Sequence, residues 1–121
     1  MNLSVIEMKA YVPARDFEVS KAFYTAIGFQ IGWSSEDMAY LHHGSASFLL
    51  QNFYVAEHAD NFMMHLLVEN VDDWHARIVA SGVAEKYGVR LDPPEDRPWG
   101  MRDFPFCDPT GVLWRIGQDI E

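Results

Sequence analysis

A pattern that occurs twice is the feature that most constrains the fold of this chain. In each half an amphipathic segment ends in a glycine followed by an apolar residue, at Ile27-Gly28-Phe29 and at Ser81-Gly82-Val83. Glycine readily adopts the left-handed backbone that ends a helix. Asp16 and Asp72 stand where a carboxylate would cap the N-terminus of each segment. The pattern predicts two helices in equivalent places of two similar modules.

Short apolar segments surround each predicted helix and have the length and composition of strands. One precedes each helix and three follow it, at residues 5–12, 29–34, 38–43 and 46–51, then 63–69, 87–91, 101–107 and 112–118. Residues 52–61 are polar and irregular, which indicates a linker. The order predicts one α+β domain over residues 1–121, built from two βαβββ modules, residues 1–53 and 62–121. Their sheets would curl around a concave cleft as an incomplete barrel.

The last predicted strand shows how one sheet would use its two faces. Asp108-Pro109-Thr110-Gly111 has the residue order of a type I turn. In the strand that follows, Val112, Trp114 and Ile116 share one face, and Leu113, Arg115 and Gly117 share the other. We expect the first face to pack on a helix and the second to line the cleft.

Charge and composition exclude several classes of partner. The net charge of −9 disfavours nucleic acid and anionic membranes, and it is compatible with a cationic small molecule. No apolar run reaches the roughly 18 residues of a membrane span, and no signal-peptide pattern opens the chain. The single cysteine, Cys107, fits a reducing compartment, so we expect a cytoplasmic protein.

Two motifs carry a family likeness. The segment from Pro13 to Tyr24, with Ile27-Gly28-Phe29 after it, resembles the opening of the vicinal oxygen chelate superfamily. That superfamily includes glyoxalase I, extradiol dioxygenases and bleomycin-resistance proteins. The segment from Arg97 to Phe104, followed by Asp108-Pro-Thr-Gly111, is most similar to the bleomycin-resistance branch. The likeness extends over nearly the whole chain.

The resemblance also implies where metal-using members would take their ligands. The matching positions hold Lys9, Phe48, Met63 and Arg115, none of which is a usual ligand of a divalent ion. If the alignment of each strand is shifted by two residues, the same faces present only Glu7 and His65 as usual metal ligands. Two ligands hold a catalytic ion poorly. We therefore expect no metal, no cofactor and no catalytic residue. The alternative is a glyoxalase-like lyase or isomerase, or a dioxygenase-related enzyme, with a displaced or absent metal site.

By the same resemblance, the chain would be a metal-free homodimer, with possible exchange of the first strand. It would sequester an aromatic, cationic compound in clefts shared between subunits, as in antibiotic resistance by drug binding. The positions that match the cleft are Trp33, Met38, His65 and Trp99, and the two tryptophans are the good stacking platforms. For Trp33 the sequence leaves a position in the cleft and a position in the core equally open. A metabolite-binding regulatory role is a third possibility.

Charged residues complete the expected ligand site. Asp60, Asp96 or Asp103 could supply counter-charge to a cationic ligand. Arg102 and Arg115 could instead clamp an anionic group, or they could pair with the acids Glu95, Asp96 and Asp103. The sequence leaves these alternatives open.

Overall fold

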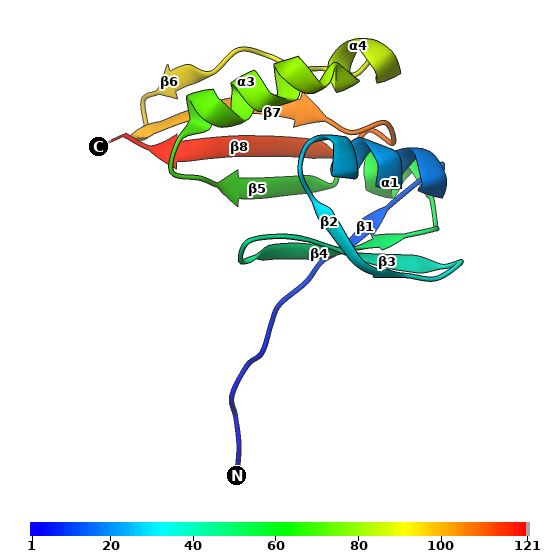
Figure 1. Ribbon diagram of the computed structural model, residues 1–121. Coiled ribbons are helices and arrows are strands. Elements are labelled where there is room, and N and C mark those ends of the chain that lie inside the picture. Colours follow the sequence, from blue (N-terminus) through cyan, green and yellow to red (C-terminus); the bar gives the residue numbers. More distant parts are fainter. Residues whose placement is uncertain (121) are drawn as a thin grey trace.

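A computed structural model describes residues 1–120, which form two four-stranded sheets of the same topology (Figure 1). The first has the order β1-β4-β3-β2 and the second the order β5-β8-β7-β6. In each sheet the first and last strands of the module are parallel, and the other neighbours are antiparallel. The strands are β1 (Tyr11–Pro13), β2 (Gln30–Ser34), β3 (Met38–His43), β4 (Ala46–Gln51), β5 (Met63–Leu67), β6 (Glu95–Arg97), β7 (Met101–Cys107) and β8 (Leu113–Asp119). The predicted α+β fold of paired βαβββ units is confirmed, and residues 1–120 form no closed barrel.

The two main helices are α1 (Phe17–Ala26) and α3 (Val71–Ser81). The Asp16 side chain accepts the Val19 amide proton at 3.2 Å, which confirms the predicted cap of α1. The predicted cap at Asp72 is wrong, because the Asn70 side chain accepts the Asp73 amide proton at 3.0 Å. Asp72 lies instead in the first turn, where its charge still complements the helix dipole. Gly82, at φ 74°, ends α3 as predicted.

Three predicted segments differ from the structure. The strand at 87–91 is wrong: α4 (Val83–Tyr87) occupies its start, and Leu91 makes a single bridge to Phe106. Val83 and Tyr87 are four residues apart, a helical spacing, and both pack against the core. Residues 5–12 do not form one strand, since pairing begins at Tyr11 and the preceding residues extend away from the body (Figure 1). The linker contains a short helix, α2 (Ala56–Ala59).

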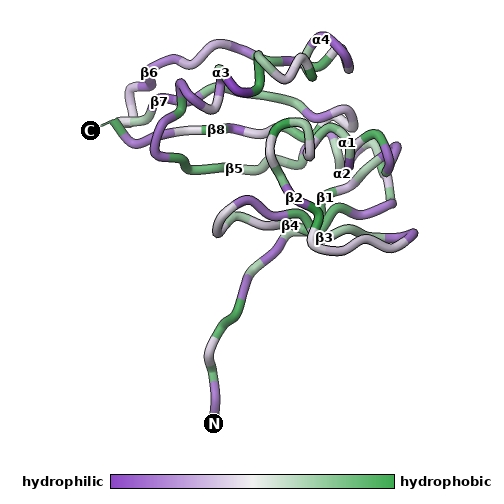
Figure 2. Tube along the Cα trace, in the orientation of Figure 1, coloured by the Kyte–Doolittle hydropathy of each residue, from purple (hydrophilic) through white to green (hydrophobic). Residues whose placement is uncertain are grey.

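One aromatic core holds both sheets together. From α1, the ring of Phe23 stacks on Phe106 of β7, with centroids 5.3 Å apart, and the ring of Tyr24 contacts Phe48 of β4 at 5.0 Å. Trp114 of β8 contacts the same Phe48 at 5.5 Å. Figure 2 shows apolar residues along α1 and the strands, and also along the N-terminal segment that lies outside this core.

A buried hydrogen-bond cluster joins the two modules inside that core. The Tyr24 hydroxyl donates to Asp108 Oδ2 at 2.5 Å and accepts from Trp114 Nε1 at 2.9 Å. Asp108 Oδ1 accepts the amide protons of Thr110, Gly111 and Val112, which fixes the predicted turn. Burial raises the pKa of both Asp108 and Tyr24. The cluster ties helix α1 of the first module to the β7–β8 turn of the second.

Candidate ligand-binding site

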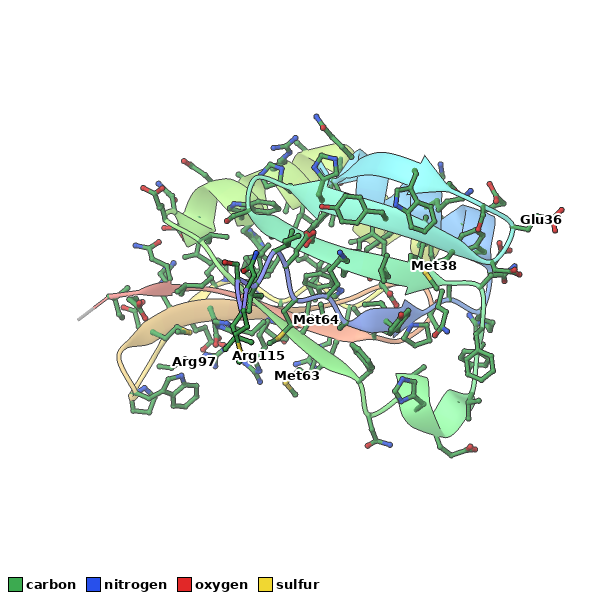
Figure 3. All side chains as sticks on the ribbon, turned by 90° about the horizontal axis from the view of Figure 1, so that it is seen from below. Glu36, Met38, Met63, Met64, Arg97 and Arg115 are labelled. Atoms are coloured by element: carbon green, nitrogen blue, oxygen red, sulfur yellow. The ribbon has the colours of Figure 1, made fainter. Side chains whose placement is uncertain are left out.

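Each sheet has one side in the core and one side turned away from it, which we term the open face. Strand alternation and register assign the residues of each. The first open face carries Trp33, Met38, Tyr40, His42, Ser47, Leu49 and Gln51, and the second carries Met63, His65, Leu67, Arg97, Asp103, Arg115 and Gly117. Figure 3 looks onto the first sheet, with Glu36 and Met38 at one side of the view and Arg97 and Arg115 at the other.

A β-bulge places Trp33 on the first open face. Ile31 pairs with Leu41 on the core side, so simple alternation would return Trp33 to that side as well. The register shifts between Ile31 and Trp33, and Trp33 then pairs with Tyr40. Gly32 permits the bulge because a Cβ at this position would lie 2.6 Å from the Tyr40 ring. Trp33 is consequently 50% exposed.

Polar contacts tie the N-terminal segment to the same face. Glu7 accepts hydrogen bonds from the hydroxyls of Ser47 and Tyr40 and from Lys9 Nζ, the last two at 2.9 and 3.1 Å. The hydrogen bond from Ser47, followed by those from Tyr40 and Lys9, lowers the pKa of Glu7 to about 2. The Tyr40 ring stacks on His42 at 5.4 Å. Glu7 is therefore a hydrogen-bonded carboxylate on an aromatic surface.

The second open face carries a cluster of two arginines on one buried acid. Asp103 is 2% exposed, and its Oδ1 accepts from Arg97 Nε at 2.8 Å and from Arg115 Nη1 at 3.4 Å. His65 of β5 lies opposite Arg115 in the register. Trp99 stands in the turn that joins β6 to β7 and is 66% exposed. Basic and aromatic groups thus share this end of the sheet.

Two of the predicted site residues lie elsewhere. Arg102 alternates to the side of β7 that α3 covers, where it binds Asp72 at 3.1 Å and Asp96 at 3.0 Å. The hydrogen bonds to Asp96 and Asp72 raise the pKa of Arg102. Asp60 follows α2 and lies beside Gly111, next to the β7–β8 turn. Neither residue shares a face with Trp33 or His65.

A cavity of about 360 Å³ opens between the two sheets. Its lining includes Ile6, Glu7 and Met8 of the N-terminal segment, together with Phe48, His65 and Trp114. Glu7 and His65 thus meet here, whereas Trp33 and Trp99 are absent from the lining. A single chain therefore presents its two exposed tryptophans on separate sheets.

The expected metal positions do not assemble a site. Phe48 is buried and faces the core, so Ser47 and Leu49 occupy the open face in its place. Met63 and Arg115 lie on the second open face, and Lys9 lies in the N-terminal segment beside Tyr40. Within residues 1–120 no three His, Cys, Asp or Glu side chains come together as metal ligands. Over the same residues no helix has the length and hydropathy to cross a membrane.

Sequence reasoning missed Tyr40, His42 and Arg97. Alternation along the predicted strand at 38–43 already placed Tyr40 and His42 on the face of Met38, so that signal was available. Arg97 gave no such signal, because its role depends on the partnership with Asp103 across the β6–β7 turn.

The chain matches known proteins along most of its length. A bleomycin resistance protein from Klebsiella pneumoniae is 26% identical over 114 residues, covering 89% of this chain and 88% of that protein. Among solved structures, a bleomycin-binding protein in complex with bleomycin superposes with a TM-score of 0.82 at 24% identity, covering 95% of this chain and 99% of the other. An antibiotic-binding protein from Streptomyces sp. CB03234 gives a TM-score of 0.75 at 24% identity, covering 98% and 99%.

The chain also matches the model of a whole protein family. The model of the Glyoxalase/Bleomycin resistance protein/Dioxygenase superfamily matches residues 6–116, which include both sheets and both main helices almost completely. The chain therefore belongs to the Glyoxalase/Bleomycin resistance protein/Dioxygenase superfamily.

Proposed function

We propose that this chain is an antibiotic-binding protein of the bleomycin-resistance type, which sequesters an aromatic small molecule without changing it. The observation that carries the proposal is the exposure of Trp33 on the first open face and of Trp99 in the turn that joins β6 to β7. Large flat side chains left in water are typical of stacking sites for planar ligands. The relatives described as bleomycin resistance and antibiotic-binding proteins support the same function.

The binding cleft would be completed by a second copy of the chain. Trp33 and Trp99 occupy different sheets, and the cavity between these sheets is lined by neither tryptophan. A ligand held between two flat rings needs them a few ångströms apart on opposite sides. A homodimer that sets the first open face of one protomer against the second open face of its partner would satisfy this requirement.

The N-terminal segment supports such a dimer. Leu3, Val5, Ile6 and Met8 are all more than four-fifths exposed, on an extended N-terminal segment (Figure 1) that is held to the first sheet through Glu7. Burial of one such side chain contributes about 1.5–3 kcal/mol, so a partner that covers several would be strongly favoured. We propose that this segment packs on, or exchanges with, the partner protomer. Replacing Ile6 and Met8 with Asp should then shift the dimer toward monomer in sedimentation experiments.

The ligand would carry a basic group near the first open face. Glu36 and Asp37 stand in the exposed turn before Met38, at the end of the face that bears Trp33 (Figure 3). The net charge of −9 also favours the approach of cations. Binding would need no metal, because Lys9, Met63 and Arg115 are poor ligands for a divalent ion. Action in the cytoplasm accords with the free thiol of Cys107.

Tryptophan fluorescence titrated with bleomycin, then with planar cations such as ethidium, tests this function. Trp99→Ala should weaken binding by about 1–3 kcal/mol, roughly 5- to 150-fold, with the unfolding midpoint unchanged. Trp99→Phe keeps a ring at this site and should retain most of the affinity. Equal affinity of the wild type and the alanine variant would refute the stacking role of Trp99.

A further inference from the structure

We infer that the Arg97–Asp103–Arg115 cluster binds an acidic substituent of the aromatic ligand, a carboxylate or sulfonate. This inference rests on the proposed function and specifies the chemistry of its ligand. The compound would be amphoteric, with its basic part toward the first open face and its acidic part toward the second.

The cluster contains more guanidinium groups than buried carboxylates. Asp103 is one carboxylate beneath two guanidinium groups, so it neutralises only one of them. Glu95 lies 3.6 Å from Arg97, but its side chain is 64% exposed, and exposed pairs at such distances are weak. The hydrogen bonds from Arg90, at 2.8 and 3.2 Å, and then the nearby charges of Arg97 and Arg115 lower the pKa of Asp92, so the Arg90–Asp92 pair borders the cluster. Of these three arginines, Arg115 has the longest contact to its nearest carboxylate, 3.4 Å against 2.8 Å for Arg90 and Arg97.

Arg115 is only loosely held within the cluster. Among residues 1–120 its one ion pair is the 3.4 Å contact to Asp103, which is long for a charge-assisted hydrogen bond. Arginine has five donor hydrogens in a planar fork, so most of them stay available to a planar acid. Asp103 is buried, whereas the side chains of Arg97 and Arg115 are 21% and 35% exposed, so Arg115 is the more accessible of the two to a ligand.

The surroundings fit the ring of the same ligand. Met63 and Leu67, on the neighbouring strand β5, are more than half exposed and flank the row that contains His65 and Arg115. Figure 3 shows Met63, Arg97 and Arg115 on the same side of the molecule. An apolar border beside a guanidinium pair is suited to an aromatic acid, whereas free inorganic anions gain nothing from the border.

Two fluorescent probes with the same ring system separate charge from stacking. 8-Anilinonaphthalene-1-sulfonate carries a sulfonate, and N-phenyl-1-naphthylamine lacks it. Both are titrated against the full-length wild type, Arg115→Gln, Arg97→Gln and Arg115→Lys. Arg102→Gln is the matched control, because Arg102 stands on the same hairpin but on its opposite side, paired with Asp72 and Asp96. Trp99→Ala tests the proposed function in the same assay.

The sulfonate probe should bind Arg115→Gln about tenfold more weakly, the value expected for one charge-assisted hydrogen bond, while the uncharged probe binds it unchanged. Arg115→Lys should fall between, and Arg102→Gln should match the wild type. Equal loss of both probes, or unchanged sulfonate binding in Arg115→Gln and Arg97→Gln, would overturn the inference. In that case a loss in Trp99→Ala would still support the proposed function.

If the wild type binds neither probe, thermal unfolding in sodium sulfate at constant ionic strength decides. A specific site predicts a smaller sulfate-induced rise of the melting temperature in Arg115→Gln than in Arg102→Gln. Equal rises in the two variants would overturn the inference.

Discussion

The two open faces share strand order and register pattern but differ in chemistry. The first combines Trp33 with the stacked rings of Tyr40 and His42 and with the hydrogen-bonded carboxylate of Glu7. The second sets Arg97 and Arg115 on the buried Asp103. The core sides of the same sheets are alike, both apolar and aromatic. The fold thus depends on the core sides, which leaves each open face free to acquire its own ligand chemistry.

The largest expected effect comes from the core, where a change should disable both faces together. Asp108→Ala removes the acceptor of the Tyr24 hydroxyl and of three backbone amides, and all of these hydrogen bonds are buried except the one from Gly111, which is partly buried. Unsatisfied buried donors each cost about 1–3 kcal/mol, so the free energy of unfolding should fall by about 3 kcal/mol or more. Urea denaturation followed by circular dichroism measures this loss.

Asp92→Ala is the matched control for Asp108→Ala. Asp92 pairs with Arg90 at an exposed site, so its removal should lower the free energy of unfolding far less than Asp108→Ala does. Similar losses in the two variants would contradict the assignment of Asp108 as the link between the modules.

A smaller effect, confined to the first face, is expected from Gly32→Ala. The new methyl group would meet the Tyr40 ring at 2.6 Å, so either the bulge or the ring must move. We expect a stability loss of about 1 kcal/mol and a several-fold weaker ligand affinity, with sulfonate-probe binding by Arg115 retained. In a Tyr40→Ala background the clash is absent, so Gly32→Ala should cost less stability there than it costs in the wild type. A Gly32→Ala variant as stable as the wild type would show that the bulge tolerates a side chain.

The smallest effect concerns Glu7 and the pH dependence of the N-terminal contact. The pKa of Glu7 is lowered from 4.5 to about 2 by its bonds to Ser47, Tyr40 and Lys9. A lowered carboxyl pKa means that the contact stabilises the folded form above pH 4.5, and that this contribution is lost as the pH falls toward 2. Carboxyl NMR titration should place the Glu7 midpoint near pH 2. A midpoint near 4.5 would show that the segment is detached in solution.

The sequence predicted the paired modules because helix stops, turns and strand alternation are local signals. Gly82 and the Asp108–Gly111 turn act within a few residues, and both are where the pattern put them. Asn70, rather than Asp72, caps α3; both residue types can accept the amide protons of a first turn, so the local pattern did not decide between them.

The candidate site was less predictable because it depends on contacts between distant segments. The sequence left Trp33 open between the core and the cleft. In the structure a one-residue bulge turns its side chain outward. The side of β7 that Arg102 occupies followed from alternation, but its partners Asp72 and Asp96 became clear only once α3 was in place. Arg97 likewise gained its role only through the buried Asp103.

The central claim is that one cleft joins the first open face of one protomer to the second open face of its partner. The most direct measurement mixes Trp33→Ala protomers with Trp99→Ala protomers and counts the high-affinity bleomycin sites by calorimetry. A shared cleft predicts that each heterodimer regains one site with both tryptophans and near wild-type affinity. A cleft within one chain predicts that every site lacks a tryptophan, so that no high-affinity binding returns on mixing, and this result would contradict the account.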